Sequence, residues 1–396
     1  MTPLAVIAGA GVAGLTTAVA LSQAGWRVRV FDRDPVLEPL GAGLGLTPNA
    51  LRALDVLGLG DAVRDRGAVQ ETGGIRRPDG RWLARSDLAF IRARFGDPVL
   101  GLHRRDLITL LADALPAGTL RTGVTVTSAT PGDADRLSLV RTTIGELTAN
   151  LVVAADGIGS RLRTALFPEH PGPVYAGYTS WRMVVPMPDY PVAATETWGR
   201  GTRFGVMHLP DGLLHLSANS VAPPRQRARD ERAEVLARFG NWHAPIPELL
   251  AAVRPGAVLH HDVAELLRPL PTFHSGRMVL VGDAAHAMTP NIGPACLAME
   301  DAVTLGLLLP AARVSEQAAA LAAYTALRLP RAVALARRSR RVGLAGQWTW
   351  PPAVAARNLG IRLGGLLPSR VTARALDGSV DWWPPARPPA ARSARG

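Results

Sequence analysis

The sequence predicts an α/β protein that combines a parallel sheet, an inserted antiparallel sheet and a helical C-terminal segment. Three observations lead to this prediction. An apolar strand pattern at 4–11 enters a glycine-rich turn and an apolar helix at 12–23. Short strand patterns alternate with turns from about 171 to 270. After a further buried strand within 277–286, helical spacing continues toward the end of the chain, broken by Pro-Pro and Gly-Gly pairs.

The first 32 residues have the pattern of a dinucleotide-binding βαβ unit. Gly9, Gly11 and Gly14 form Gly-x-Gly-x-x-Gly between strand and helix, and Asp32 ends the next alternating strand. In such a unit the glycines permit a tight turn, close approach of the backbone to a pyrophosphate, and close packing of the helix on the strand. The helix start would hold phosphates and Asp32 a ribose. A similar domain that binds no nucleotide is the alternative.

The remaining elements follow in order along the chain. Apolar spacing predicts helices at 48–63 and 105–115, and 146–157 ends in a buried strand of the parallel type. The segment Leu209-Pro210-Asp211-Gly212 lies between two strand patterns and predicts a hairpin, with a short helix following at 229–240. The tail at 385–396 is rich in proline and arginine and is predicted to be disordered.

Length and composition indicate a globular protein. The 396 residues fit two or three domains, and a hydrophobic content of 47% supports a substantial core. Cys296 is the only cysteine, which excludes an internal disulfide and favours a reducing compartment. No uninterrupted apolar run is long enough for a membrane span, and the first apolar stretch lacks a preceding basic region. We therefore expect a cytoplasmic protein without stable membrane insertion.

The positive charge is concentrated at one end of the chain. The formal net charge is +12, and arginine is the only basic residue besides histidine. From Thr325 to Gly396 there are 13 arginines against Asp377 and Asp381, so this segment carries +11 and the rest of the chain about +1. This distribution, without a nucleic-acid-binding motif, argues against a nucleic-acid partner. An arginine-rich helical end is the simplest interpretation, and contact with a membrane surface, an acidic partner or a second subunit is the alternative.

Together with this fingerprint, several motifs resemble the para-hydroxybenzoate hydroxylase type of flavoprotein monooxygenase. They include GAGVAG, FDRD, GLGLTPNALRAL, LHRRDL, AADGIGSRLR, VYAGYTSWR, RFGVMHLPDG, GRMVLVGDAAHAMTP, MEDAVTL and YTALRLPRA, and they cover nearly the whole chain. The resemblance implies a Rossmann-like FAD-binding domain with an inserted antiparallel substrate domain. We assign 1–73, 99–170 and 271–330 to the first domain, 74–98 and 171–270 to the second, and 331–384 to C-terminal helices.

The resemblance also implies an activity. NADPH or NADH would reduce FAD, reduced flavin and O₂ would form a C4a-hydroperoxide, and this species would hydroxylate a small aromatic or heteroaromatic substrate. A monomer or a homodimer is compatible with this activity. Epoxidation, Baeyer-Villiger-type insertion or another oxidative reaction on a non-aromatic substrate is the alternative within the same fold.

Cofactor-binding residues follow from the fingerprint and from family positions. As isolated dipeptides, Asp-Gly and Gly-Asp are ordinary turns, but their order here matches the family. By resemblance, Arg104 corresponds to an arginine that reaches FAD. Asp156 and Gly157 correspond to residues that contact FAD and the nicotinamide nucleotide, and Asp283 corresponds to a residue that contacts the ribityl and pyrophosphate groups. The expected set is Gly9, Gly11, Val12, Ala13, Gly14, Asp32, Arg33, Arg104, Asp156, Gly157, Gly282, Asp283, Pro290, Gly293, Pro294 and Ala295.

Candidate catalytic and substrate-pocket residues lie in the inserted segment. By resemblance, Arg203 is expected beside the reactive edge of the flavin, and His215 or His208 could accept a substrate proton. Tyr178 and Trp181 are expected to border the substrate pocket. Each has a structural alternative: Trp181 as a core residue, the histidines as satisfied polar groups and Arg203 as one member of an ion pair.

The segment beginning at Pro290 departs from the family pattern. Relatives usually have Pro-x-x-Gly-Gln-Gly-Ala, whereas Gly293-Pro294-Ala295 lacks the Gln-Gly pair and is one residue shorter. Proline is favoured at the first helical position and Gly293 can occupy the N-cap, so a helix is expected to begin near Pro294. Its N-terminal partial charge would stabilise an anionic reduced flavin.

Three other classes of protein fit the sequence less well. A flavin halogenase would require a lysine, which this chain lacks, although Trp348-Thr349-Trp350-Pro351-Pro352 superficially resembles that family's tryptophan motif. A non-catalytic flavin scaffold or redox sensor would not need every cofactor contact. A metal hydrolase is disfavoured because neighbouring His260 and His261 would point to opposite faces of a strand, so no metal site is predicted.

Overall fold

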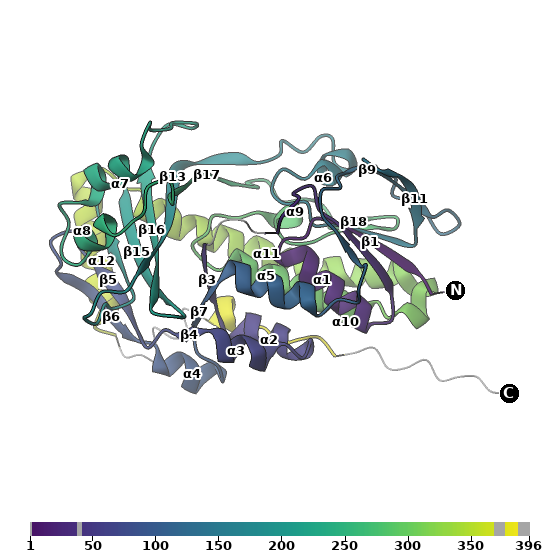
Figure 1. Cartoon of the computed structure of the whole chain (residues 1–396), viewed down its shortest axis with the longest axis horizontal. Coiled ribbons are helices and arrows are strands. Elements are labelled where there is room, and N and C mark those ends of the chain that lie inside the picture. The colour runs from purple at the N-terminus through teal and green to yellow at the C-terminus, as the bar shows by residue number, and fades with distance from the viewer. Residues whose placement is uncertain (1, 38–41, 368–376, 387–396) are drawn as a thin grey trace.

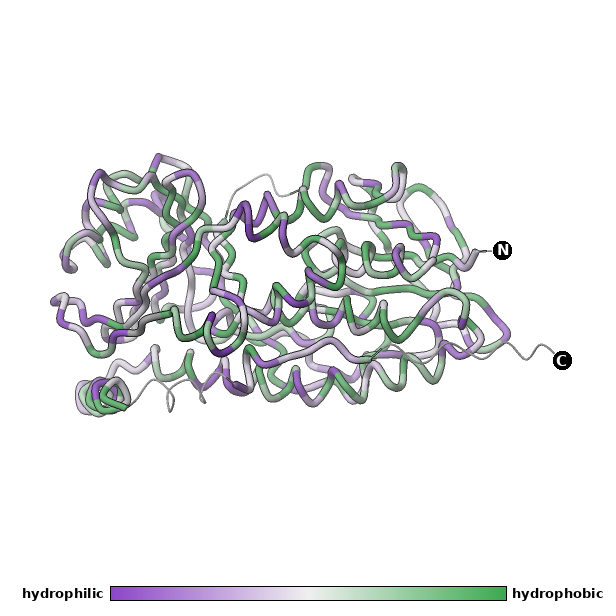
Figure 2. The backbone as a smooth tube through the Cα atoms, turned by 90° about the horizontal axis from the view of Figure 1, so that it is seen from below, coloured by the Kyte–Doolittle hydropathy of each residue, from purple (hydrophilic) through white to green (hydrophobic). Residues whose placement is uncertain are grey.

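The computed structural model describes residues 2–37, 42–367 and 377–386. Two large sheets lie side by side in the molecule, and the long helix α11 (Gln317–Gly346) runs behind them from one half to the other (Figure 1). Coloured by hydropathy, apolar and polar segments alternate along the backbone in both halves of the molecule (Figure 2). The α/β architecture predicted from the sequence is confirmed.

A six-stranded sheet forms the first half, in the order β18-β19-β12-β1-β2-β8. The central strands β19, β12, β1 and β2 are parallel to one another. Its strands are β1 (Leu4–Ala8), β2 (Arg27–Phe31), β8 (Leu120–Arg121), β12 (Leu151–Ala154), β18 (His274–Ser275) and β19 (Met278–Leu280). Every residue of β1 and β12 is buried, as expected for a parallel sheet covered on both faces.

Helix α1 (Val12–Gln23) packs against α10 (Pro294–Leu308) beside this sheet. The helix begins and ends as predicted from its apolar spacing. Gly14 permits the close approach at its start, because a Cβ there would lie 1.9 Å from the carbonyl oxygen of Gly9. A side chain at this position would therefore displace the helix from the strand.

A seven-stranded sheet forms the second half, in the order β17-β13-β16-β15-β14-β5-β6. Except for a parallel β14–β5 pair its pairings are antiparallel, and the predicted hairpin joins β15 to β16. Helices α7 (Glu231–Phe239) and α8 (Ile246–Ala251) cover one face. The strands are β5 (Thr72–Arg76), β6 (Trp82–Asp87), β13 (Val174–Pro186), β14 (Thr195–Trp198), β15 (Thr202–Leu209), β16 (Leu213–Val221) and β17 (Leu259–Glu265).

Smaller elements complete the described fold. Two three-stranded sheets have the orders β11-β10-β9 and β3-β7-β4. Their strands are β3 (Gly43–Leu46), β4 (Ala68–Val69), β7 (Leu100–His103), β9 (Val126–Ala129), β10 (Ser138–Thr142) and β11 (Gly145–Ala149). The remaining helices are α2 (Pro48–Val56), α3 (Gly60–Arg66), α4 (Ala89–Phe95), α5 (Arg104–Asp113), α6 (Arg161–Leu166), α9 (Asp283–His286), α12 (Pro351–Gly365) and a 3₁₀ helix, η1 (Ala311–Glu316).

One helix prediction requires correction. The sequence predicts a single helix at 48–63, whereas the chain forms α2 and α3 with a break between them. Gly58 adopts φ +72°, a left-handed conformation that ends α2. The predicted disordered tail lies almost entirely outside the described residues, and the domain boundaries given above stay a prediction.

A buried ionic network joins α10 to α11. Glu300 and Asp301 are fully buried in α10, and the Arg328 side chain of α11 reaches both, with Nε 2.7 Å from Asp301 and Nη2 2.8 Å from Glu300. Arg331 adds a second pair to Glu300, and Asn49 donates to the same carboxylate. Within a desolvated site, His286 and Arg328 favour the ionised Asp301 and lower its pKa to about 2.

This network also reaches the parallel sheet. Asp301 Oδ2 accepts a hydrogen bond from the backbone N–H of Gly282 and lies 2.5 Å from His286 Nε2. Gly282 follows β19 and has φ +56°, a conformation that favours glycine, so Asp301 fixes a tight turn at the carboxyl end of that strand. The carboxylate therefore connects α10, α11 and the strand-end turn.

Replacing Arg328 with methionine is expected to destabilise the protein by about 3–5 kcal/mol, because two buried carboxylates lose their shared cation. Urea unfolding of the FAD-loaded protein at neutral pH would measure this loss. Arg141→Met removes an exposed pair with Glu146 and should change the unfolding midpoint little. Equal midpoints for the two variants would contradict this account of the network.

Candidate functional site

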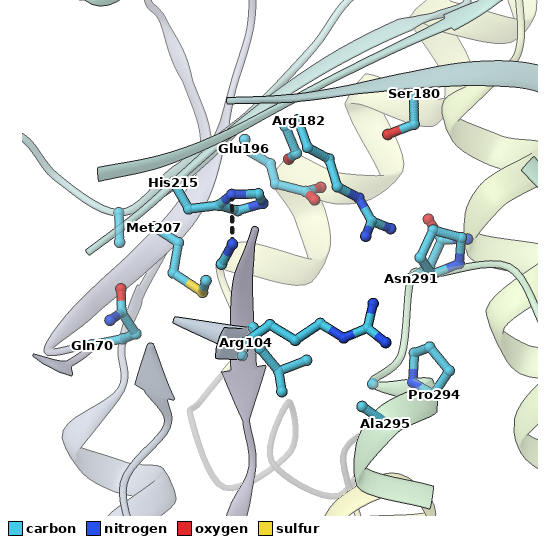
Figure 3. A pocket seen from close by; sticks show the side chains of 18 of the residues that line it. Gln70, Arg104, Ser180, Arg182, Glu196, Met207, His215, Asn291, Pro294 and Ala295 are labelled. Atoms are coloured by element: carbon cyan, nitrogen blue, oxygen red, sulfur yellow. Dashed lines mark hydrogen bonds between the residues drawn. The ribbon is translucent and has the colours of Figure 1, made fainter. Parts of the chain in front are cut away.

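A cavity of about 620 Å³ lies between the parallel sheet and the seven-stranded sheet. Its first wall comes from the turn after β1, the residue that starts α5, and the 290–295 loop at the start of α10. Its second wall is the face of the seven-stranded sheet opposite α7 and α8. Figure 3 shows Arg104, Pro294 and Ala295 on one side of this space and Arg182, Glu196 and His215 on the other.

The second half of the glycine-rich turn lies at the cavity wall. Gly11, Val12 and Ala13 line the space, whereas Gly9 and Gly14 support the turn from behind. Gly9 has φ +105°, and a Cβ there would lie 2.3 Å from the Ala155 carbonyl oxygen, so only glycine fits.

The acid after β2 stabilises this turn. Asp32 Oδ2 accepts from the Ala10 N–H at 2.5 Å, and Oδ1 accepts from the Asp34 N–H. Neither Asp32 nor Arg33 lines the cavity, and the Arg33 side chain is 76% exposed beside Asp34. The structure thus places Asp32 at the end of the strand next to the turn, and its predicted contact with a ribose stays a prediction.

Predicted cofactor residues also gather at the ends of β12 and β19. Gly157 and Asp283 line the cavity with Arg104, whereas Gly282 lies just behind. Asp156 Oδ2 accepts from the Arg161 N–H at the start of α6, and its buried Oδ1 has no hydrogen-bond partner within the described ranges. An unsatisfied carboxylate oxygen beside the cavity is available to a ligand hydroxyl.

The carboxylate of Asp283 is open to the cavity but closely surrounded by protein. The resulting desolvation raises its pKa, while His286, Arg104 and other nearby cations act in the opposite direction. A polar ligand that donates hydrogen bonds to Asp283 would replace the missing solvation.

The 290–295 loop faces the same space. Pro290, Gly293, Pro294 and Ala295 all line the cavity. The predicted helix start is confirmed: α10 begins at Pro294, and Gly293 occupies the N-cap with φ +48°. The first N–H groups of α10 and its partial positive charge are therefore positioned at the cavity wall.

Asn291 is a site residue that the sequence analysis did not identify. Its Oδ1 accepts from Arg203 Nη2 at 2.7 Å, and its Nδ2 donates to Thr289 Oγ1 and to the Ser339 carbonyl, each at 3.0 Å. One carboxamide thus connects the loop, α11 and the second cavity wall. No signal marked it, because an asparagine among prolines and glycines is also common in ordinary turns.

Arg203 lies in the cavity wall, although only 5% of it is exposed, and its predicted position beside the flavin stays a prediction. Its guanidinium carbon lies 5.5 Å from the Trp198 ring centre and 5.9 Å from that of Tyr178. A Cβ on Gly346 of α11 would approach Arg203 Cδ to 2.6 Å, so this glycine makes room for the side chain. No acidic residue in the described part of the chain forms an ion pair with Arg203.

His215 also lines the cavity. Its Nδ1 accepts from the Gly43 N–H at 3.2 Å, an arrangement that requires this nitrogen to be unprotonated. Burial, together with the positive charge of Arg182, lowers the pKa of His215 to about 3. The imidazole is therefore neutral near pH 7.

The other proposed pocket residues lie elsewhere. Trp181 and His208 belong to the sheet face opposite the cavity, because side chains alternate along β13 and β15. Trp181 donates to Glu231 and stacks on His260, and His208 Nε2 lies 2.5 Å from the Val192 carbonyl oxygen. Tyr178 is buried beside Arg203 without lining the cavity. These placements disagree with the expectation that Trp181 and His208 contact the substrate.

The same alternation identifies residues that the sequence analysis missed. Ser217 and Asn219 share the cavity face with His215, since all three are spaced by two along β16. Arg182, Glu196 and Gln70 add polar groups from neighbouring elements. The two-residue spacing from His215 would have identified Ser217 and Asn219 if the sequence had shown which face of this strand lines the cavity.

His215 should make the protein less stable as the pH is lowered from about 6.5 toward 3. Its pKa is about 3 when folded and near 6.5 when unfolded, so the folded state binds fewer protons between these values. Stability from this group is complete above pH 6.5 and decreases toward pH 3 by at most about 1.4 kcal/mol per pH unit. His215→Phe should flatten the unfolding free energy measured across this range. An unchanged slope would show that His215 does not titrate as described.

The residues around the cavity fit FAD. The fingerprint leaves backbone space at Gly11, the Asp156 oxygen and the Asp283 carboxylate can accept from ligand hydroxyls, and α10 presents free N–H groups. No group of histidine, cysteine, aspartate and glutamate residues suited to a metal occurs among the described residues. No single described helix is long and apolar enough to cross a membrane, although the bent pair α10–α11 meets those criteria by length and composition.

Comparison with known proteins agrees with this geometry. A family described as "FAD binding domain" matches residues 2–339. Aurachin C monooxygenase/isomerase of Stigmatella aurantiaca is 39% identical, over 86% of this chain and 89% of that protein. A 2-heptyl-3-hydroxy-4(1H)-quinolone synthase of Pseudomonas aeruginosa is 32% identical, over 90% and 93%.

A solved structure leads to the same conclusion. Klebsiella pneumoniae HpxO complexed with FAD and uric acid superposes with a TM-score of 0.86 at 28% identity, covering 96% of each chain. The similarity therefore extends through both large sheets. The resemblance inferred from the motifs is confirmed, and the chain belongs to the FAD-binding-domain family of flavoprotein monooxygenases.

Proposed function

We propose that this FAD-dependent monooxygenase uses NADH or NADPH and O₂ to hydroxylate a small aromatic or heteroaromatic substrate. The observation that carries the proposal is the single cavity between two unlike walls, with a nucleotide-binding turn and helix start on one side and a polar sheet face with Arg203 on the other. Overall, NAD(P)H, a proton, O₂ and the substrate C–H would give NAD(P)⁺, water and the hydroxylated product.

The first wall would hold the cofactor. Gly11 and the start of α1 suit the pyrophosphate, while Asp283 and Asp156 suit hydroxyl groups of the sugar portions. Bound FAD supplies the redox chemistry, taking two electrons from the nicotinamide and activating O₂. The N–H groups at the start of α10 would stabilise negative charge that develops on the bound ring system.

The second wall would position the substrate. Arg203 has a neutral hydrogen-bond partner in Asn291, so its positive charge can favour an anionic or deprotonated substrate. Ser217 and Asn219 add hydrogen-bonding groups that can orient a ring. The neutral His215 is held by Gly43 through Nδ1, which leaves Nε2–H as a donor in the tautomer that this bond requires. We therefore assign His215 to orientation of the substrate and not to removal of a proton.

The relatives support a ring-containing substrate. The name of the Pseudomonas enzyme specifies a quinolone, and HpxO was solved with uric acid. Both are heteroaromatic compounds with polar groups on the ring. A cavity with one buried arginine and several neutral hydrogen-bonding groups is chemically suited to this class.

A direct test is product analysis with ¹⁸O₂. The purified FAD-loaded protein would be screened with NADH and NADPH against quinolones, purines and hydroxybenzoates, recording nucleotide oxidation and product mass together. We expect one ¹⁸O atom in the hydroxylated product and one nucleotide oxidised for each product molecule. Oxygen from water, or no product across a panel that includes all three classes, would overturn the proposal.

Arg203→Met should lower kcat/KM by roughly 10- to 100-fold for an anionic substrate, since a charged hydrogen bond contributes about 1.5–3 kcal/mol. Steady-state kinetics with a matched pair of ionised and neutral ring substrates would measure this effect, which should be smaller for the neutral one. The control is Arg200→Met, because Arg200 is exposed and outside the cavity lining. Equal losses for both substrates would argue against a charge-based role.

Asn291→Asp should weaken the binding of anionic substrates, and it also removes the hydrogen bonds that the Asn291 amide donates to Thr289 and to the Ser339 carbonyl. The new carboxylate would take the place of the amide oxygen 2.7 Å from Arg203 and compensate its charge. We expect KM for an ionised substrate to rise about tenfold. Measurement of FAD content and melting temperature controls for misfolding. An unchanged KM in a folded, FAD-loaded variant would show that the charge of Arg203 does not reach the substrate.

A further inference from the structure

We propose that the outer face of α12 is a docking surface for an anionic membrane. This α12 face consists of Leu359 and Leu363 of the helix and Leu366 at its C-cap, which are 57%, 56% and 80% exposed. The leucines are spaced by four and three residues, so they lie on one side of the helix. A helix that presents large apolar side chains to water in this pattern indicates a surface that is covered in use.

The orientation of α12 is fixed by contacts on its other side. Arg357 is buried and donates to the Gly199 carbonyl at 2.9 Å and the Ala345 carbonyl at 3.2 Å. Near the end of the helix, a Cβ on Gly365 would lie 3.0 Å from Ala84 of β6, so helix and strand pack closely. The leucines therefore cannot turn inward without breaking these contacts.

The helix lies at the edge of the molecule, beside β5 and β6 (Figure 1), and Figure 2 views it nearly along its axis. This position leaves the α12 face accessible to a flat surface. Trp350 precedes the first turn of the helix, where an indole suits the boundary between water and lipid headgroups.

Charge decides between a membrane and a second copy of the chain. Exposed arginines lie on and near α12, with Arg362 on the helix, Arg85 on the neighbouring strand β6 and Arg81 just before that strand. If two copies of the chain met here about a two-fold axis, the arginines of one copy would face those of the other and repel them. An anionic bilayer would instead attract these arginines. A helix with exposed leucines, an exposed arginine and a tryptophan at its N-cap has the composition of an interfacial helix.

Docking would bring the substrate cavity to the bilayer. Helix α12 packs on β6, β6 pairs with β5, and Thr72, Gly73 and Gly74 of β5 line the cavity. One strand therefore separates the docking helix from the cavity wall. Because none of the residues of the α12 face lines the cavity, the surface can be altered without touching the site.

The test is vesicle co-sedimentation of the FAD-loaded, full-length protein. Vesicles of phosphatidylcholine alone would be compared with vesicles containing 30% phosphatidylglycerol (about one third anionic lipid), at low and high salt. We expect binding to the anionic vesicles that weakens at least threefold at high salt, and at least tenfold weaker binding for Leu359→Glu combined with Leu363→Glu.

A matched control introduces the same two charges elsewhere. Leu137→Glu combined with Ile144→Glu alters exposed residues around β10, in the other half of the molecule, and should leave binding unchanged. NAD(P)H oxidation and melting temperature would verify that both variants are folded. Absence of binding to the anionic vesicles, equal binding to neutral vesicles, or a dimer in sedimentation velocity that the Leu359/Leu363 variant abolishes would each overturn the proposal.

Discussion

The buried contact of Arg328 with Glu300 and Asp301 is the interaction on which the rest of the site depends. It fixes α11 against α10, and through the Gly282 N–H it fixes the turn that follows β19. Asp283 and the start of α10, which form part of the cavity, are adjacent to these anchored positions. Because each buried carboxylate has both a cation and further hydrogen bonds, the desolvation of the charges is compensated in this arrangement.

From this anchor, α11 carries the geometry across the molecule to the second wall. Ser339 of α11 accepts from Asn291, Asn291 holds Arg203, and Gly346 provides the space that the arginine occupies. This chain of short contacts, in which most groups are backbone or neutral amides, fixes the second wall at the cavity together with the hydrogen bonds between His215 and Gly43 and between His208 and Gln70. The charge of Arg203 consequently remains available to a ligand.

Much of the parallel-sheet half could be predicted from the sequence, because its signals are local. The glycine spacing, the apolar strands and Pro294 after Gly293 each determine the conformation of a few residues. The face of each strand in the inserted sheet was harder to predict, since it depends on register across several strands. Of the candidate residues in this sheet, Arg203 and His215 line the cavity, whereas Trp181 and His208 lie on the opposite face, and the roles predicted for Arg203 and His215 stay predictions. Asn291 required knowledge of a contact with Ser339, 48 residues away.

The central claim is that FAD and substrate share the cavity, with the flavin ring against the start of α10 and the substrate beside Arg203. A crystal structure of the FAD-loaded protein with an ionised ring substrate tests it most directly. The account predicts the ring system in contact with Pro294 and Ala295, and the substrate anion within hydrogen-bond distance of Arg203. A flavin ring located away from the α10 start, or a substrate bound outside this cavity, would contradict it.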